Sequence, residues 1–273
     1  MPNTISLEFG LSSDLFTNPL SESNIREIKK SGFRFLEIMG KYPHYDIQAL
    51  TAAFELRKII NKNDLYVRSF HPVYCDLFNS DQKIWLRNKK HITQSIEHLI
   101  SLGGNLLILH GGPLADEKPG YDERVLRAIQ NMQEILIYCE KGKREIKICI
   151  EHDGNNIKGI KNILDHFNDE RIGFCLDTSH AILYPGNYKF LNLFRSKIFT
   201  AHLSDNHGDK DDHLPPFLGI IDWKLVIQRL IENNYRGPWH FEVSAQIDSV
   251  HTLRQMRESK DRFIEHIKFI NCI

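Results

Sequence analysis

Histidine and carboxylate residues recur in this sequence at the ends of short apolar runs. One example is the run IGFCL at residues 172–176, which is followed by Asp177, with His180 three residues later. Imidazole and carboxylate groups bind divalent metals and carry protons in catalysis. If the folded chain brings the ends of these runs together, they form a metal or acid–base site. Six runs share the feature, and their polar ends are His71, His110, Glu151, Asp177, His202 and Glu242.

The apolar runs alternate with longer segments that have helical periodicity, and this alternation predicts crossover connections and a parallel sheet. The strands are expected at Thr4–Ser12, Arg34–Ile38, Leu65–His71, Asn105–His110, Ile146–Glu151, Ile172–Asp177, Ile198–Leu203 and Pro238–Val243. The helices are expected at Ser21–Ser31, Ile47–Asn63, Asp81–Leu102, Asp122–Lys141, Ile157–Phe167, Tyr188–Ser196, Trp223–Asn233 and Ser249–Ile270.

The number of strand–helix units selects the fold. Eight units in a chain of 273 residues suit the size of a (β/α)8 barrel. A doubly wound open sheet is the competing architecture, but it ordinarily has a glycine-rich phosphate turn after its first strand. Here Gly10 is followed by LSSDLF, which supplies no such turn. The sequence therefore predicts an α/β protein with one domain, a TIM barrel over residues 1–273.

A parallel barrel turns the pattern of strand ends into a prediction about a site, because all eight carboxyl ends meet on one face. Carboxylates crowded there repel one another, and a divalent cation removes that cost. Taken alone, a histidine at a strand end is ordinarily a hydrogen-bonded polar residue, and Asp177 alone would fit a turn before Thr178. The same register at six strand ends favours a metal site instead.

The segment after the seventh predicted strand, residues 204–223, is long and polar. Loops of this length are uncommon in compact domains and tend to be functional. Asp211 and His213 are two residues apart, so in an extended segment their side chains point the same way. They are expected to form a second metal-binding or substrate-binding pair, whereas His207 and Asp212 are expected to be solvated.

The composition argues against several classes of protein, although it leaves room for a local basic groove. Lys+Arg and Asp+Glu both number 35, so the formal charge is zero and does not support a strongly basic nucleic-acid binder. The five cysteines form no CxxC pair, which predicts reduced thiols in the cytoplasm. The amino terminus has no signal-peptide pattern, and no apolar run approaches the roughly 20 residues of a membrane span.

Several motifs resemble the xylose isomerase-like barrel superfamily, which includes sugar phosphate isomerases, epimerases and endonuclease IV. They are HGG at 110–112, EHDG at 151–154, CLDTSHA at 175–181, HLSDN at 202–206, DDHLPP at 211–216 and FEVS at 241–244. One departure lies in the loop after the prolines, where the relatives more often have Gly-x-Gly. Here Phe217 and Leu218 intervene before Gly219.

The resemblance to the sugar-converting branch implies a divalent metal-dependent isomerase or epimerase acting on a small polyhydroxy carbonyl compound, phosphorylated or not. The metal, which could be Mn, Zn, Mg or Co, would be held by Glu151, Asp177, His202 and Glu242. Glu151 and Glu242 would also act as acid and base on opposite faces of the substrate. Substrate contacts are implied for His71, His110, His180 and His213.

The endonuclease IV branch is the alternative, a zinc phosphodiesterase acting on abasic DNA. It implies additional zinc ligands, which would be His71, His110, His180, Asp211 and His213. Wedges into a duplex would come from Tyr42, Tyr45 and Tyr74, which otherwise fit a rim of aromatics over a small-molecule pocket. A third interpretation is a non-catalytic sugar-binding barrel, against which the pair Glu151 and Glu242 argues. Pairing of barrels into a homo-oligomer stays open.

Overall fold

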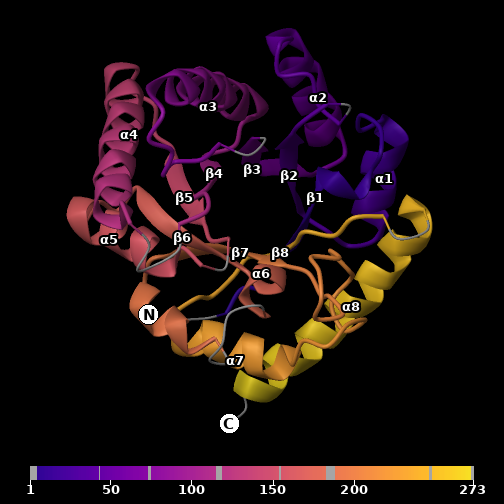
Figure 1. Ribbon diagram of the computed structural model, residues 1–273. Helices are drawn as coiled ribbons and strands as arrows, with labels where there is room; N and C mark the ends of the chain where they lie inside the picture. Colours follow the sequence, from indigo (N-terminus) through magenta and orange to yellow (C-terminus); the bar gives the residue numbers. More distant parts are fainter. Residues whose placement is uncertain are drawn as a thin grey trace.

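The computed structural model describes residues 5–42, 44–72, 75–114, 119–153, 155–182, 188–245 and 248–271. Eight parallel strands close into a barrel in chain order, and β1 pairs with β8 to complete it (Figure 1). This confirms the predicted TIM barrel. The strands are β1 (Phe9–Ser12), β2 (Phe35–Gly40), β3 (Tyr66–Pro72), β4 (Leu106–His110), β5 (Lys147–Glu151), β6 (Ile172–Asp177), β7 (Ile198–Leu203) and β8 (Trp239–Phe241).

Helices surround the barrel and connect successive strands (Figure 1). The α-helices are α1 (Glu22–Lys30), α2 (Leu50–Lys62), α3 (Gln82–Leu102), α4 (Tyr121–Lys141), α5 (Ile157–Phe167), α6 (Thr178–Ile182), α7 (Trp223–Glu232) and α8 (Ser249–Asn271). Two short 3-10 helices, η1 (Ser13–Leu15) and η2 (Lys189–Phe194), complete the set in the described residues.

The sequence prediction was wrong in three local respects. The segment expected as the helix Tyr188–Ser196 is the 3-10 helix η2, whose buried residues Leu191 and Phe194 have the spacing of three that this tighter helix places on one side. The short helix α6, directly after Asp177, was not predicted. Strand β1 begins at Phe9, and β8 ends one residue before Glu242.

Several helices begin and end where side chains satisfy their terminal backbone groups. The Asp81 carboxylate accepts hydrogen bonds from the backbone N–H groups of Lys83 and Ile84 at the start of α3. Gly103 follows that helix with φ 85°. This left-handed conformation commonly ends helices, and glycine adopts it without the steric penalty of a Cβ atom. Asp222 caps α7 in the same way as Asp81 caps α3. These caps fix where α3 begins and ends and where α7 begins.

The barrel has two separate apolar regions. The large one lies between the sheet and the helices, whereas the small one consists of Leu106, Ile108, Cys149 and Cys175, with Phe199 packed against it. Interiors of such barrels are ordinarily filled by layers of branched apolar side chains. The strands here also bury polar side chains, namely those of Ser12, Glu37, Ser69, His71, Glu151, Asp177, Thr200, His202 and His240. Polar groups buried at this density require partners, and they point to a functional interior.

In the part of the chain that the structure describes, no helix combines the length and the apolar character that a membrane crossing requires.

Candidate metal centre and active site

Four side chains meet at the carboxyl end of the barrel, and we call them the central cluster: Glu151, Asp177, His202 and Glu242. They come from β5, β6, β7 and the residue after β8. Each contributes a ligand atom, and these atoms all lie within 4.8 Å of one another. The His202 Nδ1 atom is 2.8 Å from Glu151 Oε1 and 2.9 Å from Glu242 Oε2. The sequence pattern predicted this convergence, because parallel strands bring their ends to one face.

The central cluster confines three carboxylates in a buried space, with exposures of 1% for Glu151, 0% for Asp177 and 4% for Glu242. Burial raises the pKa of Asp177 to about 6, and the carboxylates of Glu151 and Glu242 add to that effect. Burial opposes a charge on His202, but the surrounding carboxylates outweigh it and hold its pKa well above the usual range. A positive charge among these carboxylates therefore stabilises the cluster.

The donor set of the central cluster fits a divalent cation. It offers carboxylate oxygens and one imidazole nitrogen, the ligand types that Zn, Mn and Co accept. In addition, the Oδ2 atom of Asp177 is fully buried and has no hydrogen-bond partner. An orphaned buried carboxylate oxygen is costly unless it is paired or coordinates a metal. A cation among these four residues would satisfy it.

Two further histidines lie against the outer oxygen of Glu151. The Nε2 atom of His71, at the end of β3, is 3.0 Å from Glu151 Oε2. The Nδ1 atom of His110, at the end of β4, is 3.7 Å from the same oxygen and 3.0 Å from Asp153 Oδ1. The centroids of the two imidazole rings are 4.8 Å apart. Both predicted histidines therefore border the central cluster, on the side of β3 and β4.

His180, Asp211 and His213 form a second group, which we call the outer cluster. The Nδ1 atoms of the two histidines lie 2.8 Å and 3.1 Å from the backbone oxygens of His152 and Glu242. A carbonyl only accepts, so each Nδ1 carries a proton. Both Nε2 atoms converge on Asp211 Oδ2, at 3.2 Å and 2.9 Å.

Electrostatics link the outer cluster to the central one. Burial opposes charge on its histidines, but Asp177 and Asp211 outweigh it and raise the pKa of His180 to about 12. Asp211 likewise raises the pKa of His213 to about 10. Burial would raise the pKa of Asp211, yet hydrogen bonds with both histidines hold it below its usual range. Two imidazole nitrogens around one carboxylate suit a second cation or a polar substrate group.

The reason given for pairing Asp211 with His213 was wrong, although the two side chains do meet. The prediction assumed an extended segment, whereas His213 has φ 48° and lies in the left-handed region. The backbone turns at this residue and folds its ring back onto Asp211. A positive φ at a residue other than glycine is uncommon and clusters at functional sites.

The loop that carries Asp211 and His213 is folded around Asp205, whose role the sequence did not reveal. The buried carboxylate of Asp205 accepts hydrogen bonds from the backbone N–H groups of Phe217 at 3.0 Å and Ile221 at 3.1 Å. It also accepts one from Trp223 Nε1 at 2.8 Å. A Cβ atom on Gly219 would lie 2.2 Å from the Asn206 oxygen, so this position requires glycine. Phe217 and Leu218 thus sit in a loop of defined shape.

A cavity of about 240 Å³ opens above both clusters. It is lined by the predicted residues His71, His110, Glu151, His180, Asp211, His213 and Glu242. On the other side it is lined by Asp14, Met39 and Lys41, which the sequence analysis did not identify. The Lys41 Nζ atom is 2.7 Å from Asp14 Oδ1, and Ser244 Oγ donates a hydrogen bond to Asp14 Oδ2. Asp14 follows the first strand, and only its place in LSSDLF hinted at the site.

The three tyrosines considered as rim aromatics have different environments. Tyr42 is 88% exposed, next to the cavity residue Lys41. Tyr45 is only 5% exposed, and its hydroxyl lies 2.6 Å from His98 Nδ1, so the structure contradicts a rim or wedge role for it. Tyr74 lies outside the described residues.

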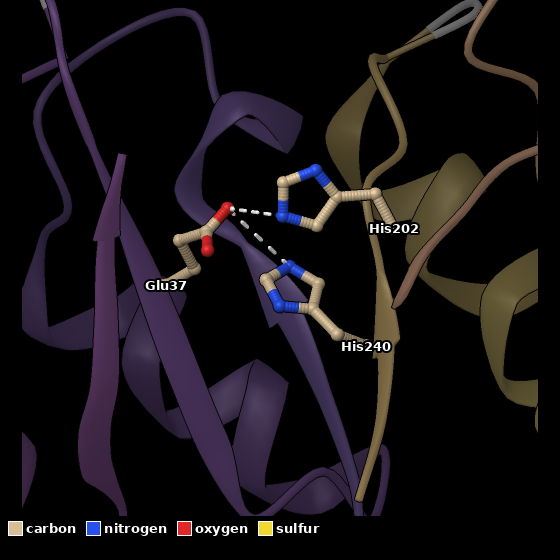
Figure 2. Close-up of side chains that lie close together, drawn as sticks. All are labelled: Glu37, His202 and His240. Carbon is tan, nitrogen blue, oxygen red and sulfur yellow. Dashed lines mark ion pairs between the residues drawn. The ribbon is translucent and has the colours of Figure 1, made fainter. Parts of the chain in front are cut away.

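Sequence reasoning also missed two residues beneath the central cluster, Glu37 of β2 and His240 of β8. Figure 2 shows Glu37 facing the rings of His202 and His240. The two histidines come from β7 and β8, which β1 separates from β2. All three side chains are 0% exposed. The available signal was an acidic residue inside the apolar run RFLEIMG.

Comparisons with known proteins agree with this architecture. Residues 25–270 match the family described as the xylose isomerase-like TIM barrel, so the chain belongs to that family. An uncharacterised protein of Sinorhizobium fredii, y4fM, is 30% identical over 106 residues, which cover 37% of this chain and 34% of that protein. A probable endonuclease 4 of Mycobacterium ulcerans is 27% identical over 176 residues, covering 60% of this chain and 67% of that protein.

Solved structures share the whole fold at low identity. A D-tagatose 3-epimerase-like protein superposes with a TM-score of 0.78 and 21% identity, covering 97% of this chain and 98% of its own. An L-ribulose 3-epimerase superposes with a TM-score of 0.76 and 15% identity, covering 96% of this chain and 97% of its own. The IOLI protein, solved with a bound zinc atom, superposes with a TM-score of 0.78 and 16% identity, covering 95% of this chain and 99% of its own. At this identity the similarity shows the fold, not the reaction.

Proposed function

We propose that this protein is a metal-dependent epimerase or isomerase of a small polyhydroxy carbonyl compound. The observation that carries the proposal is the central cluster, in which three carboxylates and an imidazole lie buried within 4.8 Å of one another. Two of its members, Glu151 and Glu242, line a small polar cavity. The sugar epimerases among the structural neighbours support the same class of reaction.

The proposed metal ligands are Glu151, Asp177, His202 and Glu242. A divalent cation held there would act as a Lewis acid toward the carbonyl and hydroxyl oxygens of the substrate. The mixed carboxylate and imidazole set favours Zn, Mn or Co over Mg, which prefers oxygen ligands. The zinc atom in the IOLI structure is consistent with this choice.

Glu151 and Glu242 are the proposed acid and base. Burial would raise their pKa values, but His202 outweighs it, lowering that of Glu242 to about 2 and that of Glu151 well below its usual range. Without a metal, both groups are therefore carboxylates at neutral pH. A bound divalent cation would take over the role of the charged His202 and keep them ionised, so that either could accept a proton from a carbon next to the substrate carbonyl. Their positions on β5 and after β8 allow one to remove a proton and the other to return it.

The cavity lining suits hydroxyl groups better than a phosphate. His71, His110, His180 and His213 are proposed to contact substrate hydroxyls, and Asp211 and Asp14 add acceptors. Among the described lining residues, Lys41 is the one lysine or arginine, and it is paired with Asp14, while His180 and His213 are both paired with Asp211. We therefore propose an unphosphorylated substrate.

The test follows proton exchange with solvent. The protein is loaded with Mn²⁺ or Zn²⁺, incubated in D2O with ketopentoses, ketohexoses and their phosphates, and examined by proton NMR. Deuterium at the carbon beside the carbonyl of at least one free sugar is the expected result. Glu242→Gln, assayed at a metal concentration at which elemental analysis shows one bound ion, should lose exchange, whereas Glu265→Gln, on the exposed face of α8, should change neither metal content nor exchange. Full exchange by Glu242→Gln would refute the acid–base assignment.

A second candidate function is zinc-dependent cleavage of abasic DNA. The observation that favours it is the outer cluster together with His71 and His110, because these residues could hold ions beside the central one. The net charge of zero argues against it, since duplex binding depends on cationic contacts with phosphates. About three zinc ions per chain and incision of an abasic duplex would establish this function. One exchangeable ion and an intact duplex would exclude it.

A further inference from the structure

The Glu37 carboxylate lies directly beneath the proposed metal centre. Its Oε1 atom is 3.4 Å from His202 Nε2 and 3.7 Å from His240 Nε2 (Figure 2). Its Oε2 atom accepts a hydrogen bond of 2.7 Å from Ser69 Oγ. Glu37 is 0% exposed, and a buried carboxylate persists only where it is hydrogen-bonded or paired. The partners available to it are therefore Ser69 and the two imidazoles.

The His202 ring connects Glu37 to the central cluster, because its two nitrogens face opposite sides. The Nδ1 atom faces Glu151 and Glu242, at 2.8 Å and 2.9 Å. The Nε2 atom faces Glu37. A neutral imidazole carries one proton, so Nδ1 offers a lone pair to a cation only when the proton is on Nε2. In that tautomer Nε2–H lies on the side of the Glu37 carboxylate, 3.4 Å from Oε1, and among the described residues neither Nε2 nor Oε1 has another hydrogen-bond partner.

We propose that Glu37 is a positioning residue that selects this tautomer of His202, an inference that rests on the proposed metal centre. By accepting the Nε2–H, the carboxylate directs the Nδ1 lone pair into the central cluster and makes it more basic. Carboxylates behind metal-binding histidines have this effect in other proteins. His240, with its Nε2 atom near the same oxygen, is a second donor that stabilises the buried charge. Its ring packs against that of His202, with centroids 5.1 Å apart, but it adds no ligand atom to the central cluster.

The same three residues could instead hold an ion of their own. Separations of 3.4 Å and 3.7 Å resemble the roughly 3.4 Å between ligands of a tetrahedral zinc with bonds of about 2.1 Å. However, His202 would then have to lose both ring protons to serve two cations. Because the tautomer requires no such loss, positioning is the stronger inference, and a second ion is an outcome that the test must detect.

The test measures Zn²⁺ affinity by competition with a chromophoric chelator, in the wild-type protein and in two variants. Glu37→Gln keeps the size of the side chain and removes its charge, and it should weaken zinc binding by about 10–100-fold. His240→Gln is the matched control, since it changes the same buried layer, and it should stay within about 3-fold. Urea unfolding of each variant shows whether the fold is retained.

A spectroscopic readout separates positioning from a structural role. Long-range proton–nitrogen NMR spectra of histidine-labelled, zinc-loaded protein report which ring nitrogen carries the proton. The signals of His202 are assigned by their loss in His202→Gln. Wild-type His202 should carry its proton on Nε2, and Glu37→Gln should broaden or shift that signal.

Each outcome decides between the possibilities. Unchanged zinc affinity in Glu37→Gln, or a wild-type His202 protonated on Nδ1, would overturn the positioning role while leaving the metal centre intact. The NMR measurement on the wild-type protein does not depend on Glu37→Gln, so a misfolded Glu37→Gln does not block the test. A second zinc ion that is lost in His240→Gln would replace positioning by a buried cation site. Failure of the wild-type protein to bind any divalent ion would overturn the proposed function as well.

Discussion

The carboxylate of Asp205 is expected to stabilise the loop of residues 204–223, and Asp205→Asn tests this. In the variant, an NH2 group replaces the oxygen that accepts from the Phe217 backbone N–H and from Trp223 Nε1, the latter at 2.8 Å. An unsatisfied buried donor costs about 1–3 kcal/mol, which gives about 2–6 kcal/mol for two. Because Phe217 is partly exposed and water can reach it, the expected loss is about 2–4 kcal/mol.

The assay is urea unfolding followed by tryptophan fluorescence, since Trp223 donates to Asp205 and is 2% exposed. The matched control is Asp209→Asn, which makes the same change in charge at an exposed position of the same loop. It should alter the free energy of unfolding by less than about 0.5 kcal/mol. If Asp205→Asn loses no more than the control, the hydrogen bonds to Asp205 do not hold this loop and the reasoning is wrong.

Three further predictions concern the metal, the cavity loop and the core. Removal of the metal by a chelator should lower the melting temperature measured by calorimetry. Free metal at 100 times its dissociation constant should then raise the free energy of unfolding by about 2.7 kcal/mol. An unchanged melting temperature would contradict a metal centre. Gly219→Ala should destabilise the protein by about 1–3 kcal/mol, because its Cβ would lie 2.2 Å from a backbone oxygen. If the variant is as stable as the wild type, the loop backbone can shift to accept the added methyl group and the prediction is wrong. Tyr45→Phe should cost about 1 kcal/mol through loss of the bond to His98 and leave turnover unchanged; loss of turnover would place Tyr45 in the site after all.

The positions of the central cluster were predictable because of a topological rule. Local patterns identified eight strands and most of the helices, and parallel strands in a closed barrel bring their carboxyl ends together whatever the details of packing. Glu151, Asp177 and His202 are the last or nearly the last residues of their strands, so that rule alone placed them near one another. Glu242 follows β8 by one residue and is placed in the same way.

Contacts that depend on three-dimensional closure were not predictable. Glu37 meets His202 and His240 only because barrel closure through β1 brings β2 near β8 and β7, which are far from it in the sequence. Similarly, His213 reaches Asp211 through a left-handed turn that the loop can adopt once Asp205 anchors it.

The sequence by itself thus determined the barrel and the side chains at its rim, because strand and helix periodicity are local and strand direction follows from connectivity. The tertiary structure decided which polar groups lie beneath that rim and how the long loop closes over it. These depend on side chains packed from strands and loops far apart in the chain, and their energies exist only when all of them are in place.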